Sequence, residues 1–517
     1  MKRLEIEELS DNAVINLALD TIKIGKQALV FVNTKQGAER CAEDISKKIK
    51  TADPKLEELS LQLLHSLSRP TKQCQRLAFV SKKGIAFHHS GLTHEQRSLI
   101  EDKFREGVVK IICCTPTLAL GIDLPAFRAI IRDLRRYGFR GYTWIPVLEY
   151  LQQSGRAGRP SFDDYGESIA IASTKPEKRA IFEKYVLGEP EDIYSKLAVE
   201  PVLRTYILSL IASKIVGTNS EITSFFEKTF WAHQFRDMDK LSAIIAKMIK
   251  LLSDWRFVKM QEQDFEPASE LGKEKEIVAT ALGRRVAELY IDPWTAHFLI
   301  SCMERARSQT VNEFSFLQIV SATLEMRPLL KARVKEYDSI QEAIALNQEV
   351  LLQKEPSMYE PAYDNFIDSI KTAIFFQAWI DEKDEEYLLE TFNIRPGEIR
   401  VKLDKADWLL YASQELCKIL KLKSILAAVT KTRIRIKYGV REELFPLLKL
   451  KNIGRMRARR LYNNNIKDIS DVKKADITTL TQILGPSVAA DVKEQLGQKV
   501  EEVKQKKRKG QISLKDY

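Results

Sequence analysis

The chain has 517 residues, of which 44% are hydrophobic, so several domains with their own cores are expected and extended disorder is excluded away from the ends. Its 82 Lys and Arg residues exceed 71 Asp and Glu residues, and the net charge of +11 favours a polyanionic partner. No apolar run approaches the roughly 20 residues of a bilayer span, and no CxxC pair occurs, so we expect a cytoplasmic protein with buried thiols, no membrane contact and no zinc site.

The first 175 residues alternate short β-rich apolar runs with amphipathic stretches of helical period. This alternation predicts an α/β domain in which helices cover a parallel sheet. The expected strands are ALVFV (28–32), IAFHH (85–89), KIICCT (110–115), AIIRD (129–133) and ESIAIAS (167–173).

Residues 133–150 lie between two of these runs, and Gly138 and Gly141 bracket a turn between aromatic-rich arms. The pattern predicts a β-hairpin. Exposed aromatic side chains at its tip could stack on the last base pair of a nucleic-acid fork. The candidates are Tyr137, Phe139 and Tyr142. The alternative is a connecting hairpin packed on the sheet.

The segment QQSGRAGRP (152–160) carries two arginines three residues apart after a glycine. We expect Arg156 and Arg159 to project one turn apart from a tight backbone, where two guanidinium groups can bind one phosphate. The alternative is a surface loop with two solvated arginines.

Beyond residue 175 the period is mainly helical. In LKLKNIGRMRARRLYNNNIKDISDV (448–472), Ile453-Gly454 separates two helical patterns, as in a helix-hairpin-helix, where a glycine and free amides at a helix start bind a phosphate. The next helix adds Arg455, Arg457, Arg459 and Arg460. We therefore expect sequence-tolerant, salt-sensitive binding to a nucleic-acid backbone. The alternative is a solvated helical face. Residues 477–497 look like a degenerate second copy.

Four segments in order resemble the motifs of superkiller-type (Ski-like) helicases of superfamily two. These are LVFVNTK (29–35, motif IV), FHHSGL (87–92, motif IVa), CCTPTLALGIDLPA (113–126, motif V) and QQSGRAGRP (motif VI). The resemblance covers essentially the whole chain. It is strongest to archaeal fork-processing DNA helicases of the polymerase-theta helicase group, without their first RecA-like domain.

The resemblance implies roles for individual residues. Gln152, Arg156 and Arg159 would face ATP, with the two arginines as catalytic fingers. Gly121 and Asp123 would couple that site to the nucleic acid. The implied nucleic-acid backbone contacts are Asn33, Thr34, Ser90 and Thr115. Gln153 and Asp123 stand where the family commonly has methionine and asparagine.

The resemblance also implies a domain order. Residues 1–175 would form the second RecA-like domain with a strand-separating hairpin at 133–150, followed by a winged helix (176–290), a helical ratchet (291–440), a helix-hairpin-helix (441–498) and a basic tail (499–517). In the winged helix, residues 202–217 and 221–232 would be helices, and residues 254–261 and 279–290 a strand-bearing wing.

In the ratchet, Trp408 would stack on a base and Arg400 would touch the nucleic-acid backbone. About 80° separates these two positions around a helix, so they lie on adjoining faces. The alternative for Trp408 is core packing beside Leu409 and Leu410.

No GxxxxGK[ST] phosphate loop and no DExH box occur in the 517 residues. The chain alone should therefore not hydrolyse ATP, and ATP and Mg²⁺ would be held mainly by the missing first domain. Either a separate polypeptide supplies that domain or the chain is truncated. By the resemblance, the assembled enzyme would unwind forked DNA and repair intermediates in the 3′ to 5′ direction at the nucleoid. An RNA helicase of the same superfamily and a noncatalytic DNA-binding subunit are the alternatives.

Two smaller patterns concern the C-terminal tail and a group of three histidines. Gln511, Leu514 and Tyr517 have the QxxLxxY spacing of a peptide that binds the replication sliding clamp. His88, His89 and His94 lie close together, but this group contains no acidic or thiol ligand of its own, so we expect a positioning role and no metal.

Overall fold

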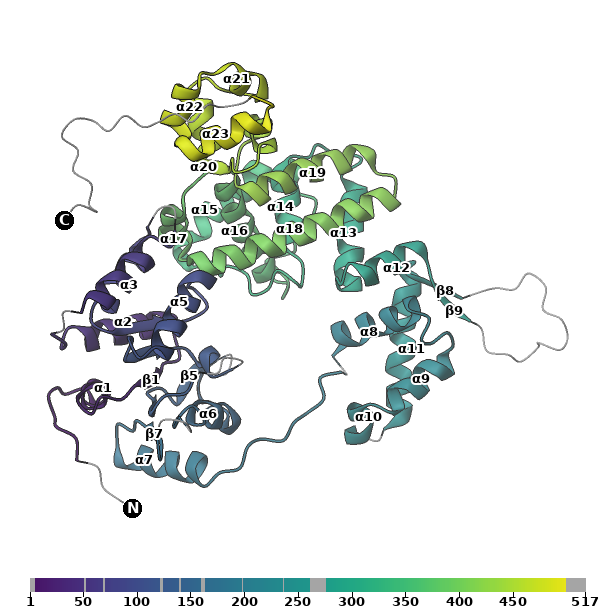
Figure 1. Cartoon of the computed structure of the whole chain (residues 1–517). Helices are drawn as coiled ribbons and strands as arrows, with labels where there is room; N and C mark the ends of the chain where they lie inside the picture. The colour runs from purple at the N-terminus through teal and green to yellow at the C-terminus, as the bar shows by residue number, and fades with distance from the viewer. Residues whose placement is uncertain are drawn as a thin grey trace. The chain divides into compact units, whose positions relative to one another are not determined.

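The computed structural model describes most of the chain as two compact units (Figure 1). Unit 1 comprises residues 1–195 and 385–402, and unit 2 comprises residues 196–384 and 403–517. In the described part, no helix is both long and apolar enough to cross a bilayer. The described residues are 5–50, 53–67, 70–120, 124–138, 141–159, 163–197, 199–235, 237–260 and 276–498.

Unit 1 is built on a five-stranded parallel sheet in the order β2-β3-β1-β4-β7. All residues of its first four strands are buried, because both faces are covered, and such strands read as continuous apolar runs. The expected α/β fold and all five expected strands are confirmed. The strands are β1 (Ala28–Phe31), β2 (Ile85–His88), β3 (Ile111–Cys114), β4 (Arg128–Ile131) and β7 (Glu167–Ala170).

The helices of unit 1 begin mostly at polar caps. Thr34, Asp53, Thr71 and Thr93 each accept a hydrogen bond from a first-turn amide, which satisfies a donor that the helix leaves free. The helices are α1 (Ala13–Lys23), α2 (Lys35–Ser46), α3 (Pro54–Leu64), α4 (Lys72–Ser81), α5 (His94–Arg105), the 3₁₀ turn η1 (Pro116–Ala119), α6 (Val147–Ser154), α7 (Lys175–Ile181), the π turn η2 (Phe182–Val186) and α17 (Glu385–Phe392).

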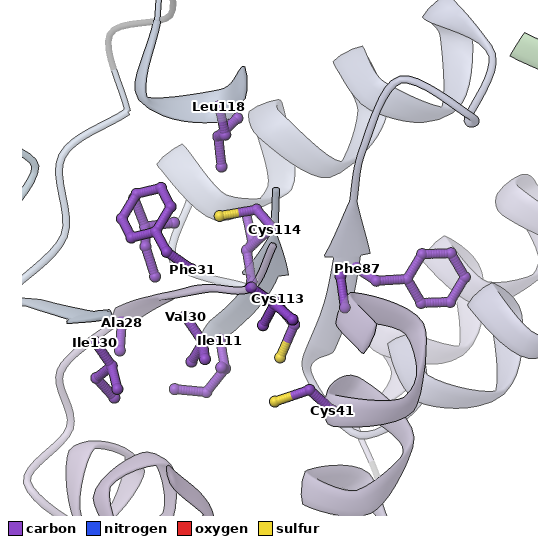
Figure 2. Close-up of a cluster of buried hydrophobic side chains, with 14 of the residues drawn as sticks. Ala28, Val30, Phe31, Cys41, Phe87, Ile111, Cys113, Cys114, Leu118 and Ile130 are labelled. Atoms are coloured by element: carbon purple, nitrogen blue, oxygen red, sulfur yellow. The ribbon is translucent and has the colours of Figure 1, made fainter. Parts of the chain in front are cut away.

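The core of unit 1 lies between the sheet and these helices. Figure 2 shows Val30, Ile111 and Ile130 gathered on the strands, with the sulfurs of Cys41 and Cys113 pointing toward one another. All six cysteines of the chain are buried and free, which confirms the expectation of buried thiols.

The expected hairpin forms from two antiparallel strands, β5 (Arg135–Gly138) and β6 (Gly141–Trp144). It ends earlier than predicted, because α6 already starts at Val147. Gly141 has φ +90°, a left-handed conformation that a side chain would oppose, so the turn depends on this glycine.

Unit 2 is mainly helical, as the period of its sequence predicts. Its first part contains α8 (Glu200–Ala212), α9 (Asn219–Glu227), α10 (Phe230–Phe235), α11 (Met238–Asp254) and α12 (Ala281–Glu288), with a two-stranded wing of β8 (Val258–Met260) and β9 (Ile277–Ala279). The prediction that residues 279–290 form a strand was wrong beyond Ala279. Thr280 caps α12, and the buried Gly283 and Val286 follow a helical period.

The rest of unit 2 is a helical bundle followed by a small module with its own core. Helix α18 starts in the segment that packs in unit 1 and continues into unit 2. The elements are α13 (Pro293–Arg305), α14 (Glu313–Ser321), the 3₁₀ turns η3 (Val334–Glu336) and η4 (Gln348–Val350), α15 (Tyr337–Asn347), α16 (Tyr363–Ile380), α18 (Pro396–Ile419), α19 (Lys423–Tyr438), the 3₁₀ turns η5 (Glu442–Leu444) and η6 (Leu447–Lys449), α20 (Arg455–Asn463), α21 (Ile469–Lys474), α22 (Ile477–Leu484) and α23 (Pro486–Gln495).

Candidate nucleotide and nucleic-acid sites

Polar side chains follow three neighbouring strands of the unit 1 sheet at their carboxyl ends. Asn33 and Thr34 follow β1, Ser90 follows β2 and Thr115 follows β3. Since β2, β3 and β1 are adjacent and parallel, these residues lie at one edge of the sheet, the edge where open α/β sheets bind ligands. Thr34 and Ser90 are exposed, whereas Thr115 is buried.

Each of these side chains except Ser90 also has a local structural role. The Thr34 hydroxyl accepts a hydrogen bond from Gly37 N at 3.0 Å and so caps α2. The Asn33 amide Nδ2 donates to Arg135 O at 2.7 Å, which ties β1 to the base of the hairpin. The Thr115 and Thr117 hydroxyls are 2.9 Å apart. The edge therefore combines structural anchors with exposed polar groups.

Of the two predicted arginine fingers, Arg156 lies in the turn that ends α6, where its N–H donates to Gln153 O at 3.2 Å, and Arg159 lies three residues further on. Ala126 N donates to Arg156 O at 2.9 Å, and Gly158 N donates to Ala126 O at 2.7 Å. Ala157, between the two arginines, forms an isolated parallel bridge with Ala126. The Arg156 guanidinium donates to Ala119 O through Nη2 at 2.6 Å.

Arg159 is held by an acid that the motif did not reveal. Its Nε donates to Asp163 Oδ2 at 2.7 Å, and its Nη1 donates to Gln27 Oε1 at 2.7 Å. Lys26 Nζ also donates to Asp163, at 2.6 Å. The hydrogen bonds from Arg159 and Lys26 together lower the pKa of Asp163 to about 2, against the opposing effect of burial. The Asp163 side chain is only 1% exposed, so this carboxylate stays ionised and restrains Arg159.

The other predicted nucleotide contacts are Gln152, Gly121 and Asp123. Gln152 lies near the end of α6 and is half-buried. Gly121 and Asp123 lie outside the described residues.

The loop that carries Ser90 packs in unit 1 against the segment at the start of α18. Gly397 N donates to Gly91 O at 3.0 Å. A Cβ atom at Gly397 would lie 2.3 Å from Leu92 O, so only glycine permits this approach.

The buried carboxylate of Glu39 lies beside this loop. Arg395 Nε donates to Glu39 Oε1 at 2.9 Å, His89 Nε2 lies 3.1 Å from the same oxygen, and Arg76 also binds this carboxylate. Gly91 N donates to His89 Nδ1 at 3.1 Å, so the proton of the neutral ring is on Nε2, facing Glu39. The cluster holds the Ser90 loop in place.

The spacing of the histidines in the sequence did not reveal the two acids that they contact. His89 binds Glu39, and His88 Nε2 lies 2.8 Å from Glu101 Oε1, although neither acid is close in sequence. No group of three or more His, Cys, Asp or Glu side chains in the described part could hold a metal ion.

The hairpin presents aromatic side chains to solvent. Tyr137 and Tyr142 are directly paired across β5 and β6 and are 83% and 68% exposed, so neither is packed on the sheet. At the base, the Arg135 guanidinium lies 3.9 Å from the centre of the Trp144 ring, and Arg136 pairs with Glu149. Phe139 lies outside the described residues.

Arg400 and Trp408 both lie on α18. Arg400 is exposed and Trp408 is half-buried. The Trp408 indole Nε1 donates to Leu289 O at 3.1 Å, so its polar edge is used to join α18 to the chain after α12.

The four arginines of α20 have different environments. Arg459 forms ion pairs with Glu382 at 2.5 Å and Glu443 at 2.8 Å. Arg455 lies over the Trp379 ring at 4.8 Å. Arg457 and Arg460 are exposed, and Gly454 at the helix start has open space where a side chain would be.

Residues 477–497, the predicted second copy of the helix-hairpin-helix, also form a helix, a glycine and a second helix. Gly485 lies between α22 and α23 and has φ +86°. The clamp-like residues Gln511, Leu514 and Tyr517 lie outside the described residues.

Three protein-family models match the chain. The model "Helicase conserved C-terminal domain" matches residues 61–161, "Helix-turn-helix domain" matches residues 166–259 and "Archaeal helicase, domain 4" matches residues 314–439.

Several curated proteins named "ATP-dependent DNA helicase Hel308" are similar to this chain. The Methanococcus vannielii protein is 36% identical over 504 residues, which cover 91% of this chain and 65% of that protein. The Pyrococcus horikoshii protein is 36% identical over 507 residues, covering 97% and 68%. The Caldivirga maquilingensis protein is 33% identical over 538 residues, covering 98% and 69%. The chain thus spans about two thirds of the length of these relatives.

Proposed function

This chain belongs to the Hel308 family of archaeal ATP-dependent DNA helicases, and on that premise we propose that it carries the DNA-gripping part of a helicase that moves 3′ to 5′. Forked DNA and repair intermediates are its substrates, in the cytoplasm at the nucleoid. The observation that carries this proposal is the set of polar loops after β1, β2 and β3, which meet at one edge of a parallel sheet.

We propose that Arg156 and Arg159 complete an ATP site. Their guanidinium groups stabilise the charge that develops on the transferred γ-phosphoryl group, while a first RecA-like domain holds the phosphates and Mg²⁺. The 517 residues contain no phosphate loop, so that domain belongs either to a separate polypeptide or to the rest of a longer chain. Arg159 reaches the γ-phosphate by exchanging at least one of its bonds to Asp163 for a bond to the nucleotide.

We propose that single-stranded DNA follows the exposed polar edge of unit 1. Thr34 and Ser90 are hydroxyl side chains that can donate to phosphates without reading bases. Asn33 and Thr115 contact the same backbone, and Gly121 and Asp123 couple the ATP site to the nucleic acid. The hairpin with Tyr137, Phe139 and Tyr142 separates the strands at the fork.

In the second half of the chain, Arg400 and Trp408 of α18 contact the single strand, and Gly454 with the α20 arginines binds its backbone. The tail residues Gln511, Leu514 and Tyr517 dock on the sliding clamp. The helix-hairpin-helix module favours DNA over the RNA substrates of related motors, and comparing DNA with RNA forks tests this preference.

The experiment mixes the purified chain with a polypeptide from a relative that carries the phosphate loop and DExH box. We expect DNA-stimulated ATP turnover only in the mixture. Arg156→Ala and Arg159→Ala should each lower turnover by about 10³- to 10⁵-fold, the usual effect of losing an arginine finger, and leave single-strand affinity unchanged.

Arg179→Ala is the matched control, because Arg179 is a solvent-exposed arginine of α7 that pairs only with Glu183 on the same helix. It should hydrolyse ATP at the wild-type rate. Substantial turnover by the chain alone, or wild-type turnover by both finger variants, contradicts the proposal. A noncatalytic DNA-binding subunit would bind DNA and never stimulate turnover in the mixture.

A further inference from the structure

Tyr290 occupies a backbone position that is unfavourable for its side chain. It follows the last turn of α12, where its N–H donates to Ala287 O at 3.1 Å. Its φ is +56°, the left-handed region in which helices usually end with glycine or asparagine. Its ring is 84% exposed, so packing does not compensate for the strain. Fold stability therefore does not account for a tyrosine here.

The backbone around Tyr290 is held from both sides. Leu289 is buried, and its carbonyl accepts the hydrogen bond from the Trp408 indole at 3.1 Å. After the tyrosine, Ile291 is buried and Asp292 forms a bidentate ion pair with Arg204 at 2.8 and 3.0 Å. The exposed ring thus extends from a fixed part of unit 2.

A second set of contacts joins α12 to α18. Arg285 Nη2 donates to Glu415 Oε2 at 2.7 Å and to the Tyr411 hydroxyl at 3.2 Å. Together with the Trp408 bond, these contacts restrain α12 at two places along α18. Binding residues on restrained helices hold their geometry better than residues on loops.

We propose that Tyr290 is a base-stacking residue for single-stranded DNA and that Trp408 positions it. The aromatic ring offers its face to a base, an interaction that every base can make. The indole N–H of Trp408 fixes the carbonyl that immediately precedes the tyrosine. This inference rests on the proposed function, since it assigns one contact of the single strand.

The test measures binding of the full chain to a fluorescein-labelled deoxythymidine oligonucleotide of about 20 nucleotides, long enough to span several stacking sites. Tyr290→Ala should weaken binding by about 5- to 100-fold, the usual effect of removing one stacking aromatic. Tyr290→Phe keeps the ring and should bind as wild type. Tyr359→Ala is the matched control, because Tyr359 of unit 2 is 91% exposed and should not affect binding.

Two further measurements separate stacking from general damage. Tyr290→Gly should weaken binding as much as Tyr290→Ala while its melting temperature stays equal to or above that of wild type, because glycine accepts the left-handed backbone. On an abasic oligonucleotide, wild type and Tyr290→Ala should bind equally. A loss on the abasic strand as large as on the normal one would overturn the stacking role.

The role of Trp408 is tested by a double-mutant cycle. Trp408→Phe removes the indole donor but keeps an aromatic ring for the single-strand contact proposed above, so it should weaken binding in the wild-type background but not in the Tyr290→Ala background. An equal loss in both backgrounds would overturn the positioning role. If the wild-type chain does not bind the oligonucleotide, the proposed function fails. If it binds and Tyr290→Ala binds equally well, only the stacking inference fails.

Discussion

At the scale of single residues, Glu39 shows how this fold carries a buried charge. Its carboxylate is 2% exposed and is bound by Arg76, His89 and Arg395. Burial alone would raise its pKa, but the hydrogen bonds from His89 and Arg395 outweigh burial and lower the pKa to about 2. The paired carboxylate therefore stabilises the fold in its ionised form, and its removal would deprive the largely buried Arg395 guanidinium of this ion pair.

We predict that the stability of unit 1 depends on pH through Glu39. Its pKa is about 2 in the fold against an ordinary 4.5, so the unfolded chain takes up the proton first. The stabilisation is complete above pH 4.5 and is lost as the pH falls toward 2. The pKa difference corresponds to about 3 kcal/mol. Glu39→Gln should lose about that much at neutral pH, measured by urea unfolding, and show a flatter dependence between pH 5 and 3.

Glu106→Gln is the control for this measurement. Glu106 is an exposed acid that pairs with Lys103 on the surface, so its loss should change the free energy of unfolding by less than about 0.5 kcal/mol. The same pH dependence in wild type and Glu39→Gln would show that other groups carry the acid sensitivity.

At the scale of elements, the β5-β6 hairpin is built to present its tip. The Asn33 amide and the stacking of Arg135 on Trp144 hold its base, whereas Tyr137 and Tyr142 remain exposed. Exposed aromatics on a fixed base are expected where a ring must meet a ligand and not the core.

We predict that Tyr137→Ala with Tyr142→Ala uncouples ATP turnover from strand separation. Losing two rings that stack at the fork should slow unwinding of a forked duplex by about tenfold or more, at about 1 to 3 kcal/mol for each stacked base. ATP turnover and single-strand affinity should be retained, and Tyr359→Ala should unwind as wild type. The measurement is a strand-displacement assay with the reconstituted enzyme. Wild-type unwinding by the double variant would rule out the wedge.

The arginines of α20 are close together in the sequence but differ in their contacts and exposure. Arg459 is held between Glu382 and Glu443, and its hydrogen bond lowers the pKa of Glu382 against the effect of burial. Arg457 and Arg460 are exposed, and Arg457 Nη1 also donates to Asn452 O at 2.9 Å. Arg459 is therefore a structural residue, and we expect Arg457 and Arg460 to bind phosphates.

We predict that replacing these arginines has different effects on the salt dependence of DNA affinity. Arg457→Ala and Arg460→Ala should each reduce the slope of log affinity against log salt by about 1, with an unchanged melting temperature. Arg459→Ala should lower the melting temperature, because it removes the ion pairs to Glu382 and Glu443, and should affect the slope less. A reduced slope at an unchanged melting temperature for Arg459→Ala would contradict this assignment.

At the scale of the whole molecule, the chain combines one α/β domain with a long helical part. The parallel sheet of unit 1 brings the loops of motifs IV, IVa and V to one edge. The helices of unit 2 include α18 with Trp408 and α20 with its four arginines. The Glu385–Lys402 segment packs with unit 1 although α18 continues into unit 2, so the two units share a helix.

Much of this organisation follows from the sequence by itself. The five strands were predictable because a parallel sheet covered on both faces requires uninterrupted apolar runs. The hairpin was predictable from its two glycines, and the helicase family from four short motifs in order, which similarity to the archaeal relatives confirmed. Local rules of period and turn chemistry determine these features, so neighbouring residues are enough to reveal them.

Only the tertiary structure decided which partners the functional side chains have. Glu39 meets Arg395 across 356 positions of the chain, and Trp408 meets Leu289 across 119. The restraint of Arg159 by Asp163 and Gln27, and the exposure of Tyr290, are equally invisible in local sequence. Such contacts depend on how distant elements pack, because the pairing of a buried charge is set by whatever the fold brings within hydrogen-bond distance.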